Sequence, residues 1–548
     1  MSEASRTFKA LTTDTPLLLL VCIVTFTAAI RLRVLDVPLE RDEGEYAYMA
    51  QLILEGVPPY AEAYNMKFPG IYFAYAVMLG LFGQTLQAIH FGLLLINGAS
   101  IILVYSIGKN LAGGWVGFSA SAAFALLTLS NRVQGFWANA EHFVVLFALA
   151  GLLALLRFRN THTGATLFFS GLLFGTAICM KQHGVFLAVA GCVVAFSFIR
   201  RDPGPRSIRF IQRTTLFLAG LATPIVLLFL TIYFSGTLER FIFWAFTYAR
   251  AYASILDIND APYYFKSGFL PLFHSTLLLW LVGGLGVVGI FASGPLKPHR
   301  TLVLSFLVGG FLAVSPGLLF RPHYFILLIP GLALSFGFGV EFIRTIFVHA
   351  RGRWLRVSPH VIVTVVALGS TVTAHADVFF SLTPHTITRL TYGGQPFAVS
   401  LSIARFIRER SDRSDKIGIV GSEPQIPFYA QRRSASGYLY INAATEPQPY
   451  ATAMRNEFIG EIEAAKPRFL LHCHLTPGWY ATGDAEKVLQ EWFQGFAGEY
   501  YRCIARFEWT PGYDAPVEPI LTVAELEAPP QQLYFISIYK RLSEAGTE

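Results

Sequence analysis

Long apolar blocks, separated by short basic or aromatic loops, dominate residues 1–383. Blocks such as Leu86–Ile107 and Thr214–Phe234 are apolar all round rather than along one stripe. A stretch of about 20 such residues is long enough to cross a bilayer as a helix. With 54% hydrophobic and only 14% charged residues, the chain is too apolar for an ordinary soluble protein. The sequence therefore predicts an α-helical polytopic membrane protein.

The basic loops give the expected orientation. Arg200–Arg213 carries five arginines, and short loops rich in Lys and Arg remain on the cytoplasmic side. Arg6 and Lys9 precede the first apolar segment, which we expect to stay as an uncleaved helix. Counting from this inner N-terminus gives about 11 transmembrane helices if Phe68–Gly83 lies in the outer interface, and about 12 if it spans. The odd count takes Phe269–Ala292 as one crossing and puts loops 31–85 and 235–268 outside.

The composition changes at about Pro384, after which no apolar run is long enough to span. Short apolar runs at Lys416–Gly421 and Arg468–His472 are typical of buried strands, whereas Ser400–Arg410 and Ala451–Ala465 have helical spacing. We therefore divide the chain into a transmembrane catalytic domain, 1–383, and a soluble α/β domain, 384–548, on the outer side.

The stretch Leu39–Gly70 is the first long polar segment, and it falls in the first outer loop. Its acids include Asp42, Glu43, Glu45, Glu55 and Glu62, its phenols are Tyr46, Tyr48, Tyr60 and Tyr64, and its only cations are Arg41 and Lys67. Carboxylates and phenols held beside a membrane suit acid–base chemistry on a polar group whose apolar tail stays in lipid. We expect Asp42 to precede a helix over Glu43–Glu55.

Several short motifs carry a family resemblance. They are RDEGEYAYMAQLILEGVPPY, then KFPGIYFAYAVMLGLFG, later GTAICMKQHG and the RPHY turn, and in the tail GSEPQIPFYAQRRSASGYLY. In this order they resemble bacterial members of the protein O-mannosyltransferase superfamily, which includes the aminoarabinose-transferase-like enzymes and has the GT-C fold. The resemblance spans nearly the whole membrane part and the start of the tail.

This resemblance implies a glycosyltransferase of the bacterial inner membrane, with its C-terminal domain outside the cytoplasm. Such an enzyme moves a sugar from a polyprenyl-phosphate donor to an acceptor hydroxyl on the outer face, with inversion at the anomeric carbon. The implied partners are that donor, a protein, glycan or lipid acceptor, and membrane lipids, but no nucleic acid. A polytopic transporter or lipid flippase is the alternative, although it should show internal repeats and charges spread along a path. A non-catalytic assembly or sensor protein is a third.

Asp42 matches the family's loop aspartate, which makes it the candidate general base for the incoming hydroxyl. Asp42-x-x-Glu45 is also the pattern of a capping box, so helix capping is the alternative role. The two roles are compatible, because a helix N-terminus stabilises an ionised carboxylate. Glu43 is the second catalytic candidate. Glu43 and Glu45 either hold a cation or the acceptor, or are ordinary acids on a helix surface.

The departing lipid phosphate needs cations or other donors. The candidates for this role are Lys67, Lys181, Arg321, His323 and Tyr324. Lys67 adjoins the interfacial segment and is alternatively a snorkelling lysine. Lys181 lies between two short apolar arms, so either a phosphate or the carboxylate of a loop acid should neutralise it. The other three share one outer turn, which is alternatively an interfacial anchor.

Further polar residues of the outer loops are candidates for the acceptor and sugar site: Glu45, Tyr46, Glu62, Glu141 and Arg250. Glu62 and Glu141 correspond to acidic positions in relatives. No cofactor is assigned and no metal site is predicted, although clustered carboxylates leave a divalent cation open. The triplet His472-Cys473-His474 is not expected to converge on one ion, because neighbours on a strand point to opposite faces.

Overall fold

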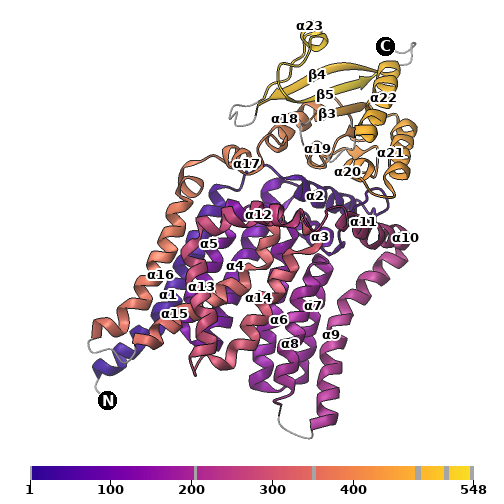
Figure 1. Cartoon of the computed structure of the whole chain (residues 1–548). Helices are drawn as coiled ribbons and strands as arrows, with labels where there is room; N and C mark the ends of the chain where they lie inside the picture. The colour runs from indigo at the N-terminus through magenta and orange to yellow at the C-terminus, as the bar shows by residue number, and fades with distance from the viewer. Residues whose placement is uncertain (1–2, 203–205, 348–352, 475–482, 511–516, 543–548) are drawn as a thin grey trace.

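The computed structural model describes residues 3–202, 206–347, 353–474, 483–510 and 517–542. A bundle of helices forms the larger part, and a domain containing a β-sheet stands on one end of it (Figure 1). The first helix starts at the opposite end of the bundle from this domain (Figure 1). The molecule is thus a predominantly helical membrane part with a small mixed domain at its C-terminal end.

The bundle consists of helices that correspond to the apolar blocks of the sequence. They are α1 (Glu3–Arg33), α4 (Leu86–Ala112), α5 (Gly114–Thr128), α6 (Ala140–Thr161), α7 (Gly164–Met180), α8 (Gly184–Ile199), α9 (Arg206–Phe234), α13 (Leu277–Ala292), α14 (Arg300–Val314), α15 (Ile329–Phe347) and α16 (Arg353–Ala374). Among the described residues, five helices are long and apolar enough to cross a membrane, or six if one bent pair counts as a span. The chain is a multi-pass membrane protein, and the number of 11 crossings stays a prediction.

One predicted crossing, Phe269–Ala292, is not a continuous helix. It consists of the end of α12 (Ala261–Ser275) followed by α13, and the two helices are bent by 94°, so the pair forms either one broken span or a re-entrant segment. The break falls at Thr276, whose backbone leaves the helical region with φ −130° and ψ 27°. Phe265, Phe269 and Phe273 stack along α12, which lies across the bundle end nearest the sheet domain (Figure 1).

Short helices of the loops that were predicted to lie outside gather at the same end of the bundle, beneath the sheet domain (Figure 1). They are α2 (Arg41–Leu54), α3 (Gly70–Phe82), α10 (Leu238–Ile242) and α11 (Ala249–Ala253). The 13 residues of α3 are fewer than the roughly 20 that a span requires. The helix expected over Glu43–Glu55 is present and begins two residues earlier.

The start of α2 corrects the expected cap. Glu40, not Asp42, is the N-cap, and its side chain accepts a hydrogen bond from the backbone N–H of Glu43. Glu43 in turn accepts from the backbone N–H of Glu40, which completes a capping box. Asp42 is therefore not the capping residue, and its carboxylate is available for other contacts.

The C-terminal domain is built around a five-stranded sheet of order β2-β1-β3-β5-β4. Its strands are β1 (Lys416–Val420), β2 (Arg433–Ser434), β3 (Phe469–His474), β4 (Tyr501–Trp509) and β5 (Tyr534–Arg541). β1 runs parallel to β2 and β3, whereas β5 is antiparallel to β3 and β4. Both predicted strands are present as β1 and β3.

The C-terminal domain also contains helices, and both predicted helices are among them. They are α17 (Pro384–Tyr392), α18 (Phe397–Arg408), α19 (Gln425–Ala430), α20 (Asn442–Thr445), α21 (Ala451–Ala465), α22 (Gly483–Tyr500) and α23 (Val523–Glu527). Sequence patterning missed α22 and β4, which follow each other directly.

The sheet domain is packed directly onto α2. Gly44 of α2 faces Gln425 of α19 so closely that a Cβ at Gly44 would lie 2.6 Å from the backbone nitrogen of Gln425. The backbone N–H of Tyr64 donates to the carbonyl of Gly437 at 2.9 Å, and the Ser434 N–H donates to the Tyr48 hydroxyl at 2.7 Å. α2 is therefore held between the bundle and the C-terminal domain.

The contact at Gly44 predicts the effect of a single methyl group. Gly44→Ala should lower the melting temperature of the purified protein by several degrees, because forcing a methyl against fixed backbone costs about 1–3 kcal/mol. Gly460→Ala in α21 is the matched control, since nothing lies within 4 Å of a Cβ there. A Gly44→Ala protein that melts with the wild type would contradict the tight packing of α2 against α19.

Candidate active site

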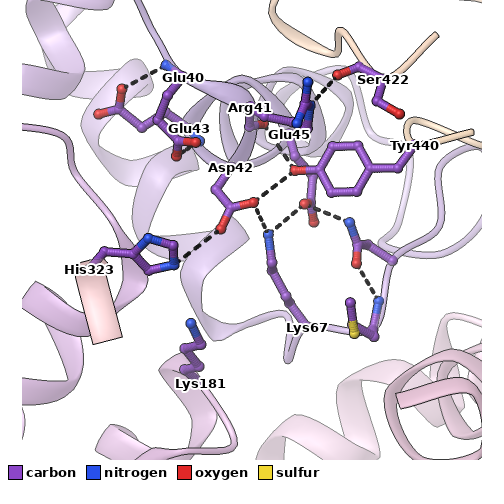
Figure 2. A network of polar contacts seen from close by, with 12 residues as sticks. Glu40, Arg41, Asp42, Glu43, Glu45, Lys67, Lys181, His323, Ser422 and Tyr440 are labelled. Carbon is purple, nitrogen blue, oxygen red and sulfur yellow. Dashed lines mark hydrogen bonds and ion pairs between the residues drawn. The ribbon is translucent and has the colours of Figure 1, made fainter. Parts of the chain in front are cut away.

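Asp42 lies at the centre of a polar network at the N-terminus of α2 (Figure 2). The Lys67 Nζ atom is 2.7 Å from Asp42 Oδ1 and 2.8 Å from Glu45 Oε2, so one ammonium joins two carboxylates. The Tyr440 hydroxyl donates to Asp42 Oδ1 at 3.0 Å from the other side. The Asp42 side chain is 20% exposed and is the open member of this group.

Glu45 fixes Lys67 from the buried side. Its carboxylate is fully buried and accepts hydrogen bonds from Asn65 Nδ2 and from the Tyr72 hydroxyl, both at 2.6 Å. The ammonium also lies 4.7 Å from the centre of the Tyr46 ring, within the range of a cation–π contact. Glu45 and Tyr46 thus hold Lys67 in place.

Glu43 points away from Asp42. Its Oε1 atom accepts from the backbone N–H of Ala138 and lies 3.1 Å from His90 Nε2, while its other oxygen completes the cap of α2. The side chain is fully buried. These contacts support a structural role, and the catalytic role of Glu43 stays a prediction.

A second lysine–carboxylate pair lies beside the first. Lys181 is paired with the fully buried Glu141, and its Nζ atom is 4.3 Å from the centre of the Tyr324 ring. His323 lies between the two pairs, because its Nε2 atom is 3.9 Å from Asp42 Oδ2 and 4.0 Å from Glu141 Oε1. The expectation that Lys181 requires a negative partner is confirmed, and the partner is Glu141.

These neighbours set the protonation states of the network. Burial alone would raise the pKa of Asp42, but its polar neighbours, Lys67 first among them, together outweigh burial and hold that pKa well below its usual range. Burial would lower the pKa of Lys67, yet Asp42 and Glu45 raise it above the usual lysine range. Burial and the nearby Lys181 lower the pKa of His323. At neutral pH the network therefore holds an Asp42 carboxylate, a Lys67 ammonium and a neutral His323.

Two cavities meet at this network. The first, which we call the polar chamber, measures about 400 Å³ and is lined by Asp42, Lys67, Arg321, His323, Tyr440 and Glu446, among others. The second, which we call the apolar groove, measures about 320 Å³ and is lined by Lys181, His183, Val185, Phe186, Ala249 and Leu319, among others. Asp42, Met66, Lys67, Tyr252 and Tyr324 line both. A ligand could therefore lie in both cavities at once and pass Asp42 on its way.

Besides Glu43, two predicted site residues lie elsewhere. Glu62 forms an ion pair at 3.0 Å with Arg433 of the C-terminal domain, and both side chains are about four-tenths exposed. Arg250 lines a separate hollow together with Phe246 and Tyr450. The remaining predicted residues, namely Asp42, Lys67, Lys181, Arg321, His323, Tyr324, Glu45, Tyr46 and Glu141, are gathered around Asp42 or line the cavities.

The sequence reasoning missed Tyr440 and Glu446, which reach the polar chamber from the C-terminal domain. Glu446 is buried and accepts from the Tyr248 hydroxyl at 3.1 Å. Burial raises the pKa of Glu446 to about 7. No spacing rule could find either residue, because each reaches the site only through the docking of the domain. Tyr440 does, however, end one of the motifs that carry the family resemblance.

The candidate metal ligands of the chain do not come together in the structure. Within the ranges that the structure describes, no three His, Cys, Asp or Glu residues are grouped so that they could hold an ion. His472 stacks on Phe493 and His474 stacks on Phe535. Cys473 and Cys503 are free thiols.

Comparison with known proteins gives both a family match and structural matches. Residues 66–247 match the family model described as dolichyl-phosphate-mannose-protein mannosyltransferase. ArnT from Cupriavidus metallidurans, bound to undecaprenyl phosphate, matches with a TM-score of 0.58 at 15% identity, over 98% of this chain and 100% of that chain. No curated protein gives a significant match to the sequence.

A second solved structure extends the comparison. The archaeal oligosaccharyltransferase AglB from Archaeoglobus fulgidus, in complex with an inhibitory peptide and a dolichol-phosphate, matches with a TM-score of 0.53 at 12% identity, over 97% of this chain and 76% of that chain. These matches confirm the resemblance found in the sequence. The chain has the GT-C fold and is a glycosyltransferase of the GT-C type.

The unequal surroundings of Glu45 and Glu62 predict unequal effects on stability. Glu45→Ala removes the buried acceptor of Lys67, Asn65 and Tyr72, and breaking a buried pair from one side costs about 3–5 kcal/mol. Glu62→Ala removes only an exposed pair, worth about 0–1 kcal/mol. Thermal unfolding in detergent should therefore show a large drop for the first variant alone. Equal melting temperatures would mean that Glu45 does not anchor the network.

Proposed function

We propose that this chain is an inverting glycosyltransferase that moves a sugar from a polyprenyl-phosphate donor to an acceptor hydroxyl, with Asp42 as the general base. The observation that carries this proposal is the meeting of the apolar groove and the polar chamber at Asp42 and Lys67. A lipid-linked sugar has an apolar tail, a charged phosphate and a polar head, and the two cavities offer surroundings of the same kinds in the same order.

The donor lies with its isoprenoid tail in the apolar groove and its phosphate near Lys67 and Lys181. Both lysines line the groove, and both are buried, where an ammonium interacts strongly with an anion. The bound undecaprenyl phosphate of ArnT and the dolichol-phosphate of AglB, two proteins of the same fold, support a donor of this chemical class. Arg321, His323 and Tyr324 reach the same point from the chamber side.

The two oxygens of Asp42 have different roles in this proposal. Oδ1 is held by Lys67 and Tyr440, whereas Oδ2 faces His323 at 3.9 Å. The acceptor hydroxyl gives its proton to Oδ2 while its oxygen attacks the anomeric carbon. The bond from that carbon to the phosphate oxygen breaks, and its electron pair leaves with the polyprenyl phosphate, whose charge the lysines stabilise. A single displacement of this kind inverts the anomeric centre.

Lys67 links donor binding to the strength of the base. In the structure its charge holds the pKa of Asp42 well below the usual range, which makes the carboxylate a weak base. A donor phosphate that draws the ammonium toward itself weakens this effect, so the pKa of Asp42 rises only when the donor is present. The charge of Lys181 also lowers the pKa of Asp42 and adds to the same control.

The site faces the outer side of a bacterial inner membrane in this proposal. α8 ends and α9 begins at the end of the bundle opposite the sheet domain (Figure 1), and arginines cluster at that connection. The positive-inside rule favours a cytoplasmic position for such a connection. Residues 384–548 then form an extracytoplasmic domain above the catalytic part, 1–383. The acceptor is a hydroxyl of a protein, a glycan or a lipid.

Asp42→Asn tests the base. Membranes that contain this variant should release polyprenyl phosphate from the host's own lipid-linked sugars about 10²- to 10⁴-fold more slowly, because the amide cannot take the proton. Mass spectrometry of the extracted lipids measures this release. Asp36→Asn is the matched control, since Asp36 is exposed, lies in the same loop and bonds only to Gln87 in the described structure. Wild-type release by the Asp42→Asn variant would rule out this base.

The phosphate role of Lys181 can be separated from its ion pair. The double substitution Lys181→Met with Glu141→Gln removes both charges, so no buried charge is left unpaired. Affinity for undecaprenyl phosphate, measured by native mass spectrometry, should fall about 10- to 100-fold, as expected for a lost hydrogen bond to a charged group. Lys109→Met, at an exposed lysine of α4, should bind normally. Normal binding by the double variant would leave Lys181 with a structural role only.

A further inference from the structure

Tyr440 reaches Asp42 from the C-terminal domain, nearly 400 positions along the chain. Its hydroxyl lies 3.0 Å from Asp42 Oδ1 and 3.0 Å from the carbonyl oxygen of Arg41. Its ring lies 5.5 Å from the Lys67 Nζ atom. One side chain therefore contacts the carboxylate of Asp42 and the carbonyl of the preceding residue (Figure 2), and its ring lies near the counter-ion Lys67.

We infer that Tyr440 is a positioning residue, which turns the Asp42 carboxylate so that Oδ2 faces the polar chamber and the acceptor. This inference rests on the proposed role of Asp42 as the base. It gives the C-terminal domain a part in the geometry of the reaction itself, in addition to forming a wall of the chamber.

The geometry of a carboxylate explains why such a residue is needed. The terminal torsion of an aspartate is broad, so the plane of its carboxylate turns easily. The two oxygens are equivalent, and exchanging them changes nothing, but Lys67 alone can bind one oxygen over a range of plane angles. With Tyr440 and Lys67 both on Oδ1, the orientation that leaves Oδ2 toward His323 is favoured.

Tyr440 can act in this way because the domain holds it rigidly. The backbone N–H of the next residue, Ile441, donates to Gly421 O at 3.3 Å and to Ser422 Oγ at 3.1 Å. The carbonyl of Ser422 accepts from Arg41 Nε at 2.6 Å, so the same turn also binds the residue before the base.

Arg41 completes a second connection to the C-terminal domain. Its guanidinium lies 3.1 Å from Oε1 of the fully buried Glu423 and donates to Gln395 Oε1 at 2.9 Å. Residues 41 and 42 are therefore tied to the domain at two points. One is the Arg41 guanidinium, and the other is the Tyr440 hydroxyl that bonds to Asp42. A rigid domain fastened at these two points limits the rotation of the carboxylate.

The Tyr440 hydroxyl is a donor at every working pH, because burial first, and then the negative charges of Glu45 and Asp42, raise its pKa well above the usual range. Its one proton is shared between Asp42 Oδ1 and the Arg41 carbonyl. A donor to an ionised carboxylate stabilises the charged form. Removal of this hydroxyl should therefore raise the pKa of Asp42.

Tyr440→Phe tests the inference, because the ring is kept and only the hydroxyl is lost. We expect kcat to fall about 10- to 100-fold with little change in KM for the lipid donor, and the acidic limb of the pH–rate profile to move to higher pH. The other groups that face Asp42, namely Glu40, Glu45, Lys67, Lys181 and His323, are unchanged. Replacing Tyr440 by 3-fluorotyrosine, a stronger donor that also preserves packing, should move the same limb to lower pH.

Tyr501→Phe is the matched control. The Tyr501 hydroxyl donates to the Pro467 carbonyl at 2.9 Å within the C-terminal domain, so its loss should leave the profile in place. An active Asp42→Asn variant would overturn the proposed function. If Asp42→Asn is inactive but Tyr440→Phe keeps the wild-type kcat, or loses rate without moving the acidic limb, the base stands and the positioning role of Tyr440 is overturned.

Discussion

The ammonium of Lys67, shared between Asp42 and Glu45, is the interaction on which the site depends. Two carboxylates less than two helical turns from the start of α2 would repel each other in a buried setting. One lysine placed between them removes that cost and joins α2 to the segment that begins α3. The buried side of this group is closed by Asn65 and Tyr72, which bond to Glu45, and by the Tyr46 ring, which lies beside Lys67. Asp42 is therefore the carboxylate that keeps an open face.

The bundle and the need of Lys181 for a negative partner could be predicted because they follow from local rules, whereas the pairing of Lys67 with Asp42 and Glu45 was not predicted. Continuous apolar blocks form helices in a membrane, and a lysine such as Lys181 between apolar arms must find a negative partner. The roles of neighbouring acids could not be predicted in this way. Glu43 and Glu45 are two positions apart on one helix, and only packing decides that one faces His90 and the other Lys67. The cap at Glu40 and the break at Thr276 depend on backbone choices that hydropathy does not reveal.

Long-range docking explains the other misses. Tyr440 and Glu446 belong to a domain whose strands and helices were partly visible in the sequence, but nothing local says which of its turns meets α2. Glu62 shows the converse, because it lies in the acidic loop and yet pairs with Arg433 at the surface. The close approach of Gly44 to Gln425 is part of the packing that brings these distant segments together, and residues of the docked domain line part of the polar chamber.

The pairing of both lysines with carboxylates also bears on which anions can occupy the site. The two lysines, Lys67 and Lys181, are paired with three carboxylates, those of Asp42, Glu45 and Glu141. The carboxylates therefore outnumber the ammonium groups by one. A small free anion such as inorganic phosphate would have to compete with these internal partners and would bury no hydrocarbon in return. A molecule that also buries a long hydrocarbon chain in the adjoining groove recovers that loss through the hydrophobic effect. Discrimination against soluble phosphates is thus set by the pairing of the two lysines, before any sugar is recognised.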